Sequence, residues 1–297
     1  MSDESAAFLY DPARLYSPRY VHDVLDAHGI RLKKGLGQNF LFDRNAILKI
    51  VNAAGVGPDD VVLEIGPGMG HLTFALLARA KHVIAVEIDQ RLLPVLKGLL
   101  GGFSNFTLVH ADILEVDLAA RLGEAGLMPT KVVANVPYYV TTPILTHLVE
   151  SGVPFDNVTL TIQKEVAERY VAAPGTKAYG SISVVMNYWG RTRLCGTVPA
   201  SCFFPRPQVD SAVIRVDLFK QPPVGLANKA LFYRVIRMAF NQRRKMLRNS
   251  LHALETEGFA LDRALAAAGI DEKVRAERLT MQDYARLADA LITETAE

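Results

Sequence analysis

Glycine and short polar residues recur at similar intervals in the first half of the chain, and their types suit the binding of a nucleoside. A Gly-Pro-Gly-Met-Gly run begins at Gly66, and polar residues follow at successive intervals of 21, 25 and 23 residues: Glu87, Asp112 and Asn135. A carboxylate can accept hydrogen bonds from both hydroxyls of a ribose. Glycine lets a ligand approach the backbone because it has no Cβ.

The glycine run lacks the spacing that holds a pyrophosphate. It has the form Gly-x-Gly-x-Gly, whereas dinucleotide-binding folds carry Gly-x-Gly-x-x-Gly, and no Gly-Lys-Ser/Thr sequence is present to bind phosphates. A tight turn between a strand and a helix is the alternative explanation for the glycines. An adenosine ligand without a pyrophosphate fits better than NAD or ATP. We therefore predict S-adenosyl-L-methionine as the cofactor and S-adenosyl-L-homocysteine as its product.

The tetrapeptide Asn135-Val136-Pro137-Tyr138 suits chemistry at an exocyclic amine. The lone pair of adenine N6 is delocalised into the ring, so this nitrogen is a poor nucleophile. A carboxamide oxygen and a backbone carbonyl can accept its two hydrogens and direct the lone pair towards a methyl donor. Tyr138 offers a ring on which the base can stack. The alternative is an asparagine-capped turn with a buried tyrosine.

Strand and helix patterns alternate around these residues and predict an α/β fold. Short β-rich runs lie at Val61–Ile65, Val83–Val86, Phe106–Val109, Lys131–Ala134 and Val158–Ile162. Helical patterns separate them at Leu72–Arg79, Gln90–Leu100, Pro143–Glu150 and Lys164–Ala172. This alternation predicts parallel βαβ units, which bring the carboxyl ends of the strands to one edge of the sheet. Val213–Leu218 is expected to be a late strand that pairs antiparallel.

Three parts of the chain are predicted. Residues 1–30 form a helical extension with a helix at Tyr20–His28, and no role is assigned to residues 1–25. Residues 31–220 form the catalytic domain, which begins with a helix over Arg44–Ala54 capped by Asp43. A proline- and glycine-containing linker over 220–225 leads to an all-α domain, residues 221–297.

Composition excludes several classes of protein. The 297 residues are 50% hydrophobic and 22% charged, which is a globular balance rather than that of a disordered chain. Two cysteines exclude a disulfide framework, and the seven histidines show no spacing typical of metal ligands, so no metal is expected. The start, MSDES, does not resemble a secretory signal, and no apolar run approaches the ~20 residues of a membrane span. A soluble cytoplasmic protein with no membrane partner is expected.

Positive charge is concentrated in residues 231–250, a stretch that contains no acidic residue. Basic clusters attract polyanions because binding releases counterions. The residues of this stretch predicted to bind the phosphates of a polyanion are Arg243, Arg244, Lys245 and Arg248. A solvated helix face is the alternative.

Four sequence blocks, taken together and in order, resemble the ribosomal RNA adenine N6-dimethyltransferases. The blocks are 37–41 (GQNFL), 64–70 (EIGPGMG), 135–138 (NVPY) and 203–212 (FFPRPQVDSA). The resemblance extends from about Arg31 to the C-terminus, and Val136 stands where leucine is commoner in the family. It implies a Rossmann-like S-adenosylmethionine-dependent methyltransferase fold with a reversed last strand, followed by an all-α domain.

The resemblance also implies roles for individual residues. Asn39 and Leu41 would close over the cofactor, and Gly66 would pack beneath it. Glu87 would hold the ribose hydroxyls, and Asp112 would bind the cofactor's adenine amine. Asn135 would contact both the cofactor and the target N6, whereas Tyr138 and Phe203 would enclose the target base.

The implied reaction is dimethylation of N6 on two adjacent adenosines in a hairpin loop near the 3′ end of small-subunit (16S) ribosomal RNA. The expected partner is the immature 30S subunit, with a role in its assembly, and the protein is expected to be a monomer. Two alternatives stay open: a 23S rRNA adenine methyltransferase of the macrolide-resistance type, and a mainly non-catalytic assembly factor. A DNA adenine methyltransferase is disfavoured because such enzymes typically carry an acidic residue where Asn135 stands.

Overall fold

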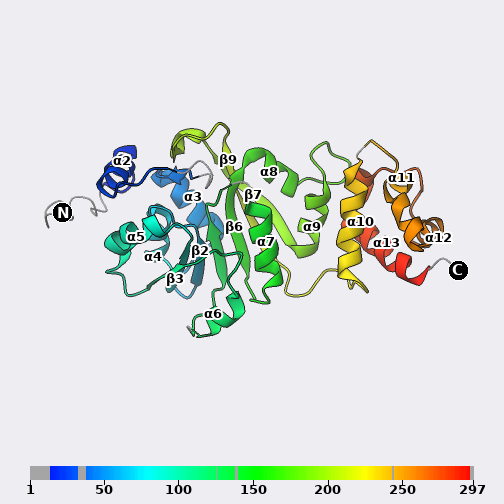
Figure 1. Ribbon diagram of the computed structural model, residues 1–297, viewed down its shortest axis with the longest axis horizontal. Coiled ribbons are helices and arrows are strands. Elements are labelled where there is room, and N and C mark those ends of the chain that lie inside the picture. Colours follow the sequence, from blue (N-terminus) through cyan, green and yellow to red (C-terminus); the bar gives the residue numbers. More distant parts are fainter. Residues whose placement is uncertain (1–13, 33–37, 125, 138–139, 243, 295–297) are drawn as a thin grey trace. The chain divides into compact units, whose positions relative to one another are not determined.

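The chain folds into two compact units in a computed structural model, which describes residues 14–32, 38–124, 126–137, 140–242 and 244–294 (Figure 1). The first unit comprises Met1–Ala167 and Arg193–Leu218, and the second comprises Glu168–Thr192 and Phe219–Glu297. The sequence-based division placed 168–192 in the catalytic domain. The second unit includes this segment because its aromatic side chains pack among the C-terminal helices.

A seven-stranded sheet forms the centre of the first unit, in the order β4-β3-β2-β5-β6-β9-β7. Five strands are parallel: β2 (Val61–Ile65), β3 (His82–Glu87), β4 (Phe106–His110), β5 (Lys131–Ala134) and β6 (Asn157–Gln163). The reversed strand β9 (Ser211–Leu218) pairs antiparallel with β6, as predicted. The strand order changes direction between β2 and β5, and ligands in open α/β sheets bind at such a switch point.

The edge strand β7 (Gly190–Val198) was not predicted. Its arginines and glycines interrupt any regular alternation, and most of its side chains are only partly buried or exposed. An edge strand beside a reversed strand leaves little hydrophobic pattern in the sequence, because few of its side chains enter a core.

Most helices of the first unit follow the prediction, but the helix over Leu118–Glu124 was not predicted. They are α3 (Arg44–Ala54), α4 (His71–Leu77), α5 (Leu93–Leu100), α6 (Leu118–Glu124), α7 (Thr141–Glu150) and α8 (Lys164–Tyr170). Asp43 caps α3 by accepting the Ala46 N–H at 2.8 Å, which confirms the predicted start of this helix. The single helix predicted over Gln90–Leu100 is instead a 3₁₀ turn, η2 (Gln90–Leu92), followed by α5, whose first turn contains a proline.

The helical extension is part of the hydrophobic core of the first unit. Helix α2 spans Pro18–Ala27, so it begins two residues before the predicted start, and Ser17 caps it. Its apolar face and the preceding Leu15 are fully or almost fully buried. Farther along the chain, β1 (Phe40–Leu41) pairs antiparallel with β8 (Phe203–Phe204), which follows the 3₁₀ turn η4 (Ala200–Cys202).

The second unit is helical, as the prediction for the C-terminal part of the chain stated. Its helices are α9 (Ser181–Trp189), α10 (Lys229–Asn241), α11 (Leu247–Leu251), η5 (His252–Glu257), α12 (Leu261–Ala267), η6 (Ala276–Arg278) and α13 (Met281–Thr293). Trp189 donates a hydrogen bond to the Tyr233 hydroxyl at 2.9 Å, and Tyr179 donates to the Leu279 carbonyl at 2.9 Å. These bonds connect 168–192 to the C-terminal helices. Within the described residues, no helix combines the length and apolar character needed to cross a membrane.

Candidate cofactor and base site

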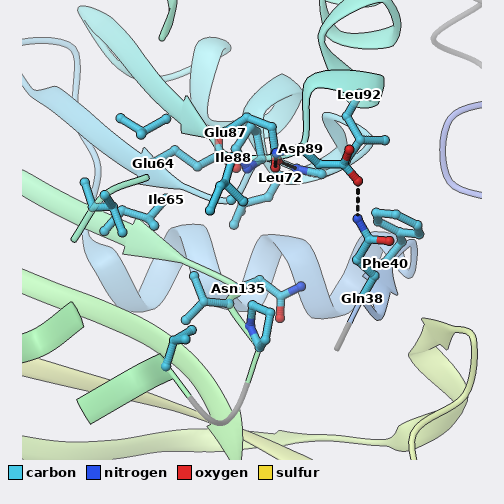
Figure 2. Close-up of a pocket in the computed structure, with 18 of the residues that line it drawn as sticks. Gln38, Phe40, Glu64, Ile65, Leu72, Glu87, Ile88, Asp89, Leu92 and Asn135 are labelled. Carbon is cyan, nitrogen blue, oxygen red and sulfur yellow. Dashed lines mark hydrogen bonds between the residues drawn. The ribbon is translucent and has the colours of Figure 1, made fainter. Parts of the chain in front are cut away.

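A cavity of about 310 Å³ lies at the carboxyl ends of the parallel strands (Figure 2). It collects all of the predicted cofactor-binding and base-contacting residues that the structure describes: Asn39, Leu41, Gly66, Glu87, Asp112, Asn135 and Phe203. Tyr138 lies outside the described residues. Residues separated by more than 160 positions therefore share one site, because the parallel strands end at the same edge and β1–β8 closes over it.

The glycine run forms a tight loop that only glycine can adopt. Gly66, Gly68 and Gly70 have φ angles of 68°, 58° and 83°. A Cβ on Gly68 would lie 3.1 Å from the Phe40 ring, and one on Gly70 would lie 3.0 Å from Leu99. The loop therefore packs closely against its surroundings while its backbone faces the cavity.

Glu87 is held by the backbone at the end of β3. It is 4% exposed, and each of its oxygens accepts one backbone N–H, from Gly68 at 3.1 Å and from Asp89 at 2.8 Å. Burial raises the pKa of this carboxyl, and the backbone hydrogen bonds act against that shift. Each oxygen retains a further lone pair. Glu87 can therefore accept hydrogen bonds from two ligand hydroxyls without moving.

Asn135 lies at the end of β5, with its amide nitrogen directed to the segment before α3. Its Nδ2 donates to the Asn39 carbonyl at 3.5 Å. This orientation leaves the amide oxygen as the acceptor at the cavity. Phe203 is 3% exposed and pairs with Leu41 in the β1–β8 ladder, so the two predicted closing residues support each other.

Asp112 follows β4 and is partly exposed at the far side of the cavity. Its Oδ1 accepts the Leu114 N–H at 2.9 Å. Its second oxygen is available to a ligand, since no other hydrogen bond to this side chain occurs among the described residues.

Two residues that the sequence analysis did not assign connect the N-terminal segment to β3. Gln38 donates through Nε2 to Asp89 Oδ2 at 2.8 Å, as Figure 2 shows. Arg91 holds the same carboxylate and also donates to the Arg31 carbonyl at 2.7 Å. Burial alone would raise the pKa of Asp89, but the hydrogen bonds from Arg91 and Gln38 outweigh it and keep that pKa below its usual range.

Four buried acceptor atoms, on three residues, have no hydrogen-bond partner of good geometry at the cavity among the described residues. They are both oxygens of Glu64, Oε1 of Gln38 and Nε2 of His71. Burial raises the pKa of Glu64 to about 8; the Thr73 hydroxyl opposes this shift, and the Glu87 carboxylate adds to it. The sequence signals for Glu64 and His71 are a glutamate inside an otherwise apolar strand and a histidine that opens a mostly apolar helix.

The lining is acidic. It contains Glu64, Glu87, Asp89 and Asp112, and no lysine or arginine among the residues that the structure describes. Such a cavity repels phosphates and attracts cations. S-adenosylmethionine carries a sulfonium and an ammonium group, so its positive charges and hydrogen-bond donors match the unsatisfied acceptors. The residues present therefore fit this cofactor.

The predicted RNA-binding residues lie in the second unit and differ in their surroundings. Arg243 lies outside the described residues, whereas Arg244 and Lys245 are exposed with no ion pair in the described chain. Arg248 is held by Asp262 at 2.7 Å and by Glu255 at 3.2 Å. No cluster of three or more His, Cys, Asp or Glu suited to a metal occurs within the described ranges.

The sheet order, the reversed strand and the acidic cavity at the glycine loop define a Rossmann-like methyltransferase that uses S-adenosyl-L-methionine. A family model described as "Ribosomal RNA adenine dimethylase" matches residues 29–293. The chain therefore belongs to the ribosomal RNA adenine dimethylase family. The predicted fold class, enzyme class and cofactor are confirmed.

Relatives and solved structures agree with this assignment. Proteins named "Ribosomal RNA small subunit methyltransferase A" include one from Clostridium perfringens, 44% identical over 269 residues, covering 91% of this chain and 94% of the relative. Another, from Geobacillus thermodenitrificans, is 44% identical over 282 residues, covering 93% and 96%. A crystal structure of a dimethyladenosine transferase from Plasmodium falciparum shares the fold, with a TM-score of 0.67, 24% identity and coverage of 82% and 94%. The 23S rRNA methyltransferase ErmE has a TM-score of 0.63 and 27% identity, covering 86% of this chain and all of that one.

Proposed function

We propose that this enzyme dimethylates N6 of two adjacent adenosines in a hairpin loop near the 3′ end of small-subunit ribosomal RNA. The observation that carries the proposal is the Asn135 carboxamide at the end of β5, on the same cavity as the glycine loop and Glu87. The names of the relatives at 44% identity support the small ribosomal subunit as the substrate. We further propose that the protein acts as a monomer in the cytoplasm on the immature 30S subunit.

Asn135 activates the target amine by accepting its hydrogens. The amide oxygen and a backbone carbonyl of the following Val136–Pro137 segment each accept one N6 hydrogen, which draws the nitrogen towards tetrahedral geometry. The methyl sulfonium supplies an activated methyl group, so alignment is the main requirement. S-adenosylmethionine, when bound, would supply the methyl group and keep the sulfur electron pair as S-adenosylhomocysteine, and the methylated nitrogen would release a proton to solvent. Tyr138 and Phe203 hold the base between their rings.

The remaining cavity residues hold the cofactor. Glu87 accepts the two ribose hydroxyls, and Asp112 accepts a hydrogen bond from the adenine amine. Gly66 gives the ligand access to the backbone, while Asn39 and Leu41 cover it from the N-terminal segment. The burial of Leu41 and the two backbone bonds to Glu87 support these roles, because they fix both groups before a ligand arrives.

Contact with RNA phosphates is assigned to Arg243, Arg244, Lys245 and Arg248. Arg244 and Lys245 suit direct contact because they are exposed and carry no ion pair in the part of the chain that the structure describes. The two acids on Arg248 make it the weakest phosphate ligand of the group, since RNA must compete with them. Such contacts set affinity and register rather than sequence choice.

A 23S rRNA methyltransferase is the second candidate, because ErmE shares the fold at 27% identity over its whole length. The two candidate functions are distinguished by testing purified 30S and 50S subunits that lack the modification as methyl acceptors. The proposal expects dimethyladenosine in 16S rRNA only. Methyl transfer to 23S rRNA alone contradicts it.

The catalytic role is tested with Asn135→Ala. Loss of its carbonyl should reduce methyl transfer by about 100-fold or more, on the order of the loss of one transition-state hydrogen-bonding group. Binding of 30S subunits should be retained. If Asn135→Ala methylates at the wild-type rate, Asn135 does not activate the amine. A variant that is inactive yet restores growth to a deletion strain favours a mainly non-catalytic assembly role.

A further inference from the structure

We infer that His71 is a further cofactor-binding residue, held by the N-terminal segment so that Nε2 accepts a hydrogen bond from the cofactor's α-ammonium group. This inference rests on the proposed function, because it takes the cofactor to lie with its adenosine at Glu87 and Asp112. It gives a role to residues 14–27, which precede the glycine run by about 40 positions.

His71 is a buried polar side chain in the cavity wall. It follows Gly70 directly, opens α4 and is 3% exposed. Its Nε2 has no hydrogen-bond partner among the described residues. A buried acceptor left without a partner is destabilising, and an apolar ring of the same shape would avoid that cost. Nε2 therefore has no donor within the described protein and can accept a hydrogen bond from a ligand in the cavity.

The N-terminal segment fixes the orientation of the ring. The Leu15 carbonyl accepts a hydrogen bond from it, and the Tyr20 ring packs edge-on with centroids 5.8 Å apart and an interplanar angle of 86°. Arg14 forms an ion pair with Asp23 at 2.5 Å, which ties the start of the segment to α2. Leu15 and Tyr20 are both fully buried, so these contacts are part of the core.

The same contacts set the charge state of the ring. Burial lowers the pKa of His71 to about 4, although the bond to the Leu15 carbonyl acts in the opposite direction. The imidazole is therefore neutral at pH 7. Because Nε2 has no partner, the bond to Leu15 uses Nδ1–H, and Nε2 then carries the lone pair. A neutral acceptor is what an ammonium group requires.

The position of His71 along the cavity identifies the group it meets. Asp112, Glu87 and the glycine loop lie at the ends of β4, β3 and β2, in that order across the sheet. With the adenine at Asp112 and the ribose at Glu87, the amino-acid part of the cofactor reaches β2 and His71. The α-ammonium is the hydrogen-bond donor at that end of the molecule. Glu64, also on β2, supplies a complementary charge when the bound ammonium group favours its ionised form.

The test compares two ligands on His71→Phe, which keeps a ring but removes the acceptor. By calorimetry, S-adenosylhomocysteine should bind about tenfold or more weakly, as expected for a hydrogen bond to a charged group. Binding of 5′-methylthioadenosine, which lacks the amino-acid group, should change by less than about twofold on the same scale. His71→Gln, which restores an acceptor, should recover part of the loss.

His82→Phe serves as the matched control. His82 opens β3 at the opposite end of the strand and bonds to Thr107 at 2.8 Å, away from the cavity. Unchanged S-adenosylhomocysteine affinity in His71→Phe overturns the inference, and so does equal weakening of both ligands, which indicates a general structural role. If the wild-type protein binds neither ligand, the proposed function itself fails.

A second pair of variants tests the N-terminal segment. Tyr20→Leu removes the ring that packs on His71, whereas Tyr20→Phe retains it. Tyr20→Leu should weaken S-adenosylhomocysteine more than 5′-methylthioadenosine, and Tyr20→Phe should not show this difference. Equal ligand affinities in Tyr20→Leu and wild type would show that the segment does not orient the histidine.

Discussion

Glu64 and Glu87 stand on neighbouring strands and line the same cavity, but the protein surrounds them differently. Both oxygens of Glu87 accept backbone N–H groups, whereas neither oxygen of Glu64 has such a partner in the described chain. The hydrogen bonds that hold the side chain at the end of β3 are therefore formed before a ligand binds. The acceptors at the end of β2, on Glu64 and His71, still lack partners in the described chain. Neutral ribose hydroxyls suit the first arrangement. A positively charged donor suits the second, because it can donate hydrogen bonds to these buried acceptors and also favours the ionised form of Glu64.

The largest expected effect of this difference concerns pH and Glu64. Its pKa is about 8 in the folded protein, above the ordinary value of 4.5, so the folded state binds more protons than the unfolded state between these values. The stability that this bound proton provides is fully present below pH 4.5 and is lost as pH rises through 8. Between pH 5 and pH 8 the free energy of unfolding should fall by about 3 kcal/mol from this group.

Glu64→Gln should remove that fall, because glutamine is neutral throughout. Urea denaturation of the ligand-free protein, followed by circular dichroism at pH 5 and pH 8, measures this change in the free energy of unfolding. Glu165→Gln, at an exposed position, is the control. A pH dependence identical in Glu64→Gln and wild type would show that Glu64 is already ionised at pH 5. In calorimetry at pH 7, S-adenosylhomocysteine should also displace a proton from the wild type but not from this variant.

The next largest effect concerns Glu87, at the end of β3, which is held by backbone hydrogen bonds before a ligand binds. Glu87→Ala removes the acceptor for both ribose hydroxyls and also leaves two backbone N–H groups without their partner. S-adenosylhomocysteine and 5′-methylthioadenosine should both bind about 30-fold to 100-fold more weakly, on the order of 2–3 kcal/mol. Glu115→Ala, an exposed glutamate beyond β4, is the control. A variant that loses affinity for only one of the ligands would place the ribose elsewhere.

A smaller effect is expected for His71 in acid. Its pKa of about 4 lies below the ordinary 6.5, so the unfolded state binds more protons between these values. The wild-type protein should therefore lose about 2 kcal/mol of stability from this group between pH 7 and pH 5. His71→Phe should not show this loss in urea denaturation over that range. An unchanged pH dependence would mean that the ring is already open to protonation in the folded state.

The smallest effect concerns the bond across the cavity. Gln38→Ala removes the donor to Asp89, a neutral-to-charged contact worth about 1 kcal/mol, so the KM for S-adenosylmethionine should rise about fivefold with kcat little changed. Gln221→Ala, on the exposed linker, is the control. Equal KM values in Gln38→Ala and wild type would show that this bond does not help to retain the cofactor.

Where the predicted site residues follow strand ends, the structure places them together on one cavity. Parallel strands place their carboxyl ends together, so a glycine run and three polar residues after successive strands were enough to predict one cavity. Glu64 and His71 were not found in this way. Both belong to elements whose other residues are mostly apolar, and a sequence does not show whether a buried polar group has a partner. For these two residues, the surroundings are set by Leu15 and Tyr20, which are far away in the sequence, and by Thr73, which carries no recognisable sequence signal.

The limits of the two units were predicted less completely. Val213–Leu218 and the helical C-terminal part were recognised from local patterns. Residues 168–192 were not separated from the catalytic domain, because a short apolar helix such as α9 is compatible with either core. Its membership is decided by Trp189, Tyr188 and their aromatic partners some 45 residues later.

The chain passes between the two units at residues 167–168, 192–193 and 218–219, and this order constrains how the protein can be synthesised and cut. The sheet needs β9 and β7 to be complete, so the first unit cannot finish folding until residue 218 has left the ribosome. Tyr179, Tyr188 and Trp189 leave the ribosome earlier and stay exposed until α10 and α13 have been synthesised and cover them. A fragment that stops at residue 220 would therefore expose an aromatic surface and aggregate, whereas an insertion in the exposed 220–225 linker should be tolerated.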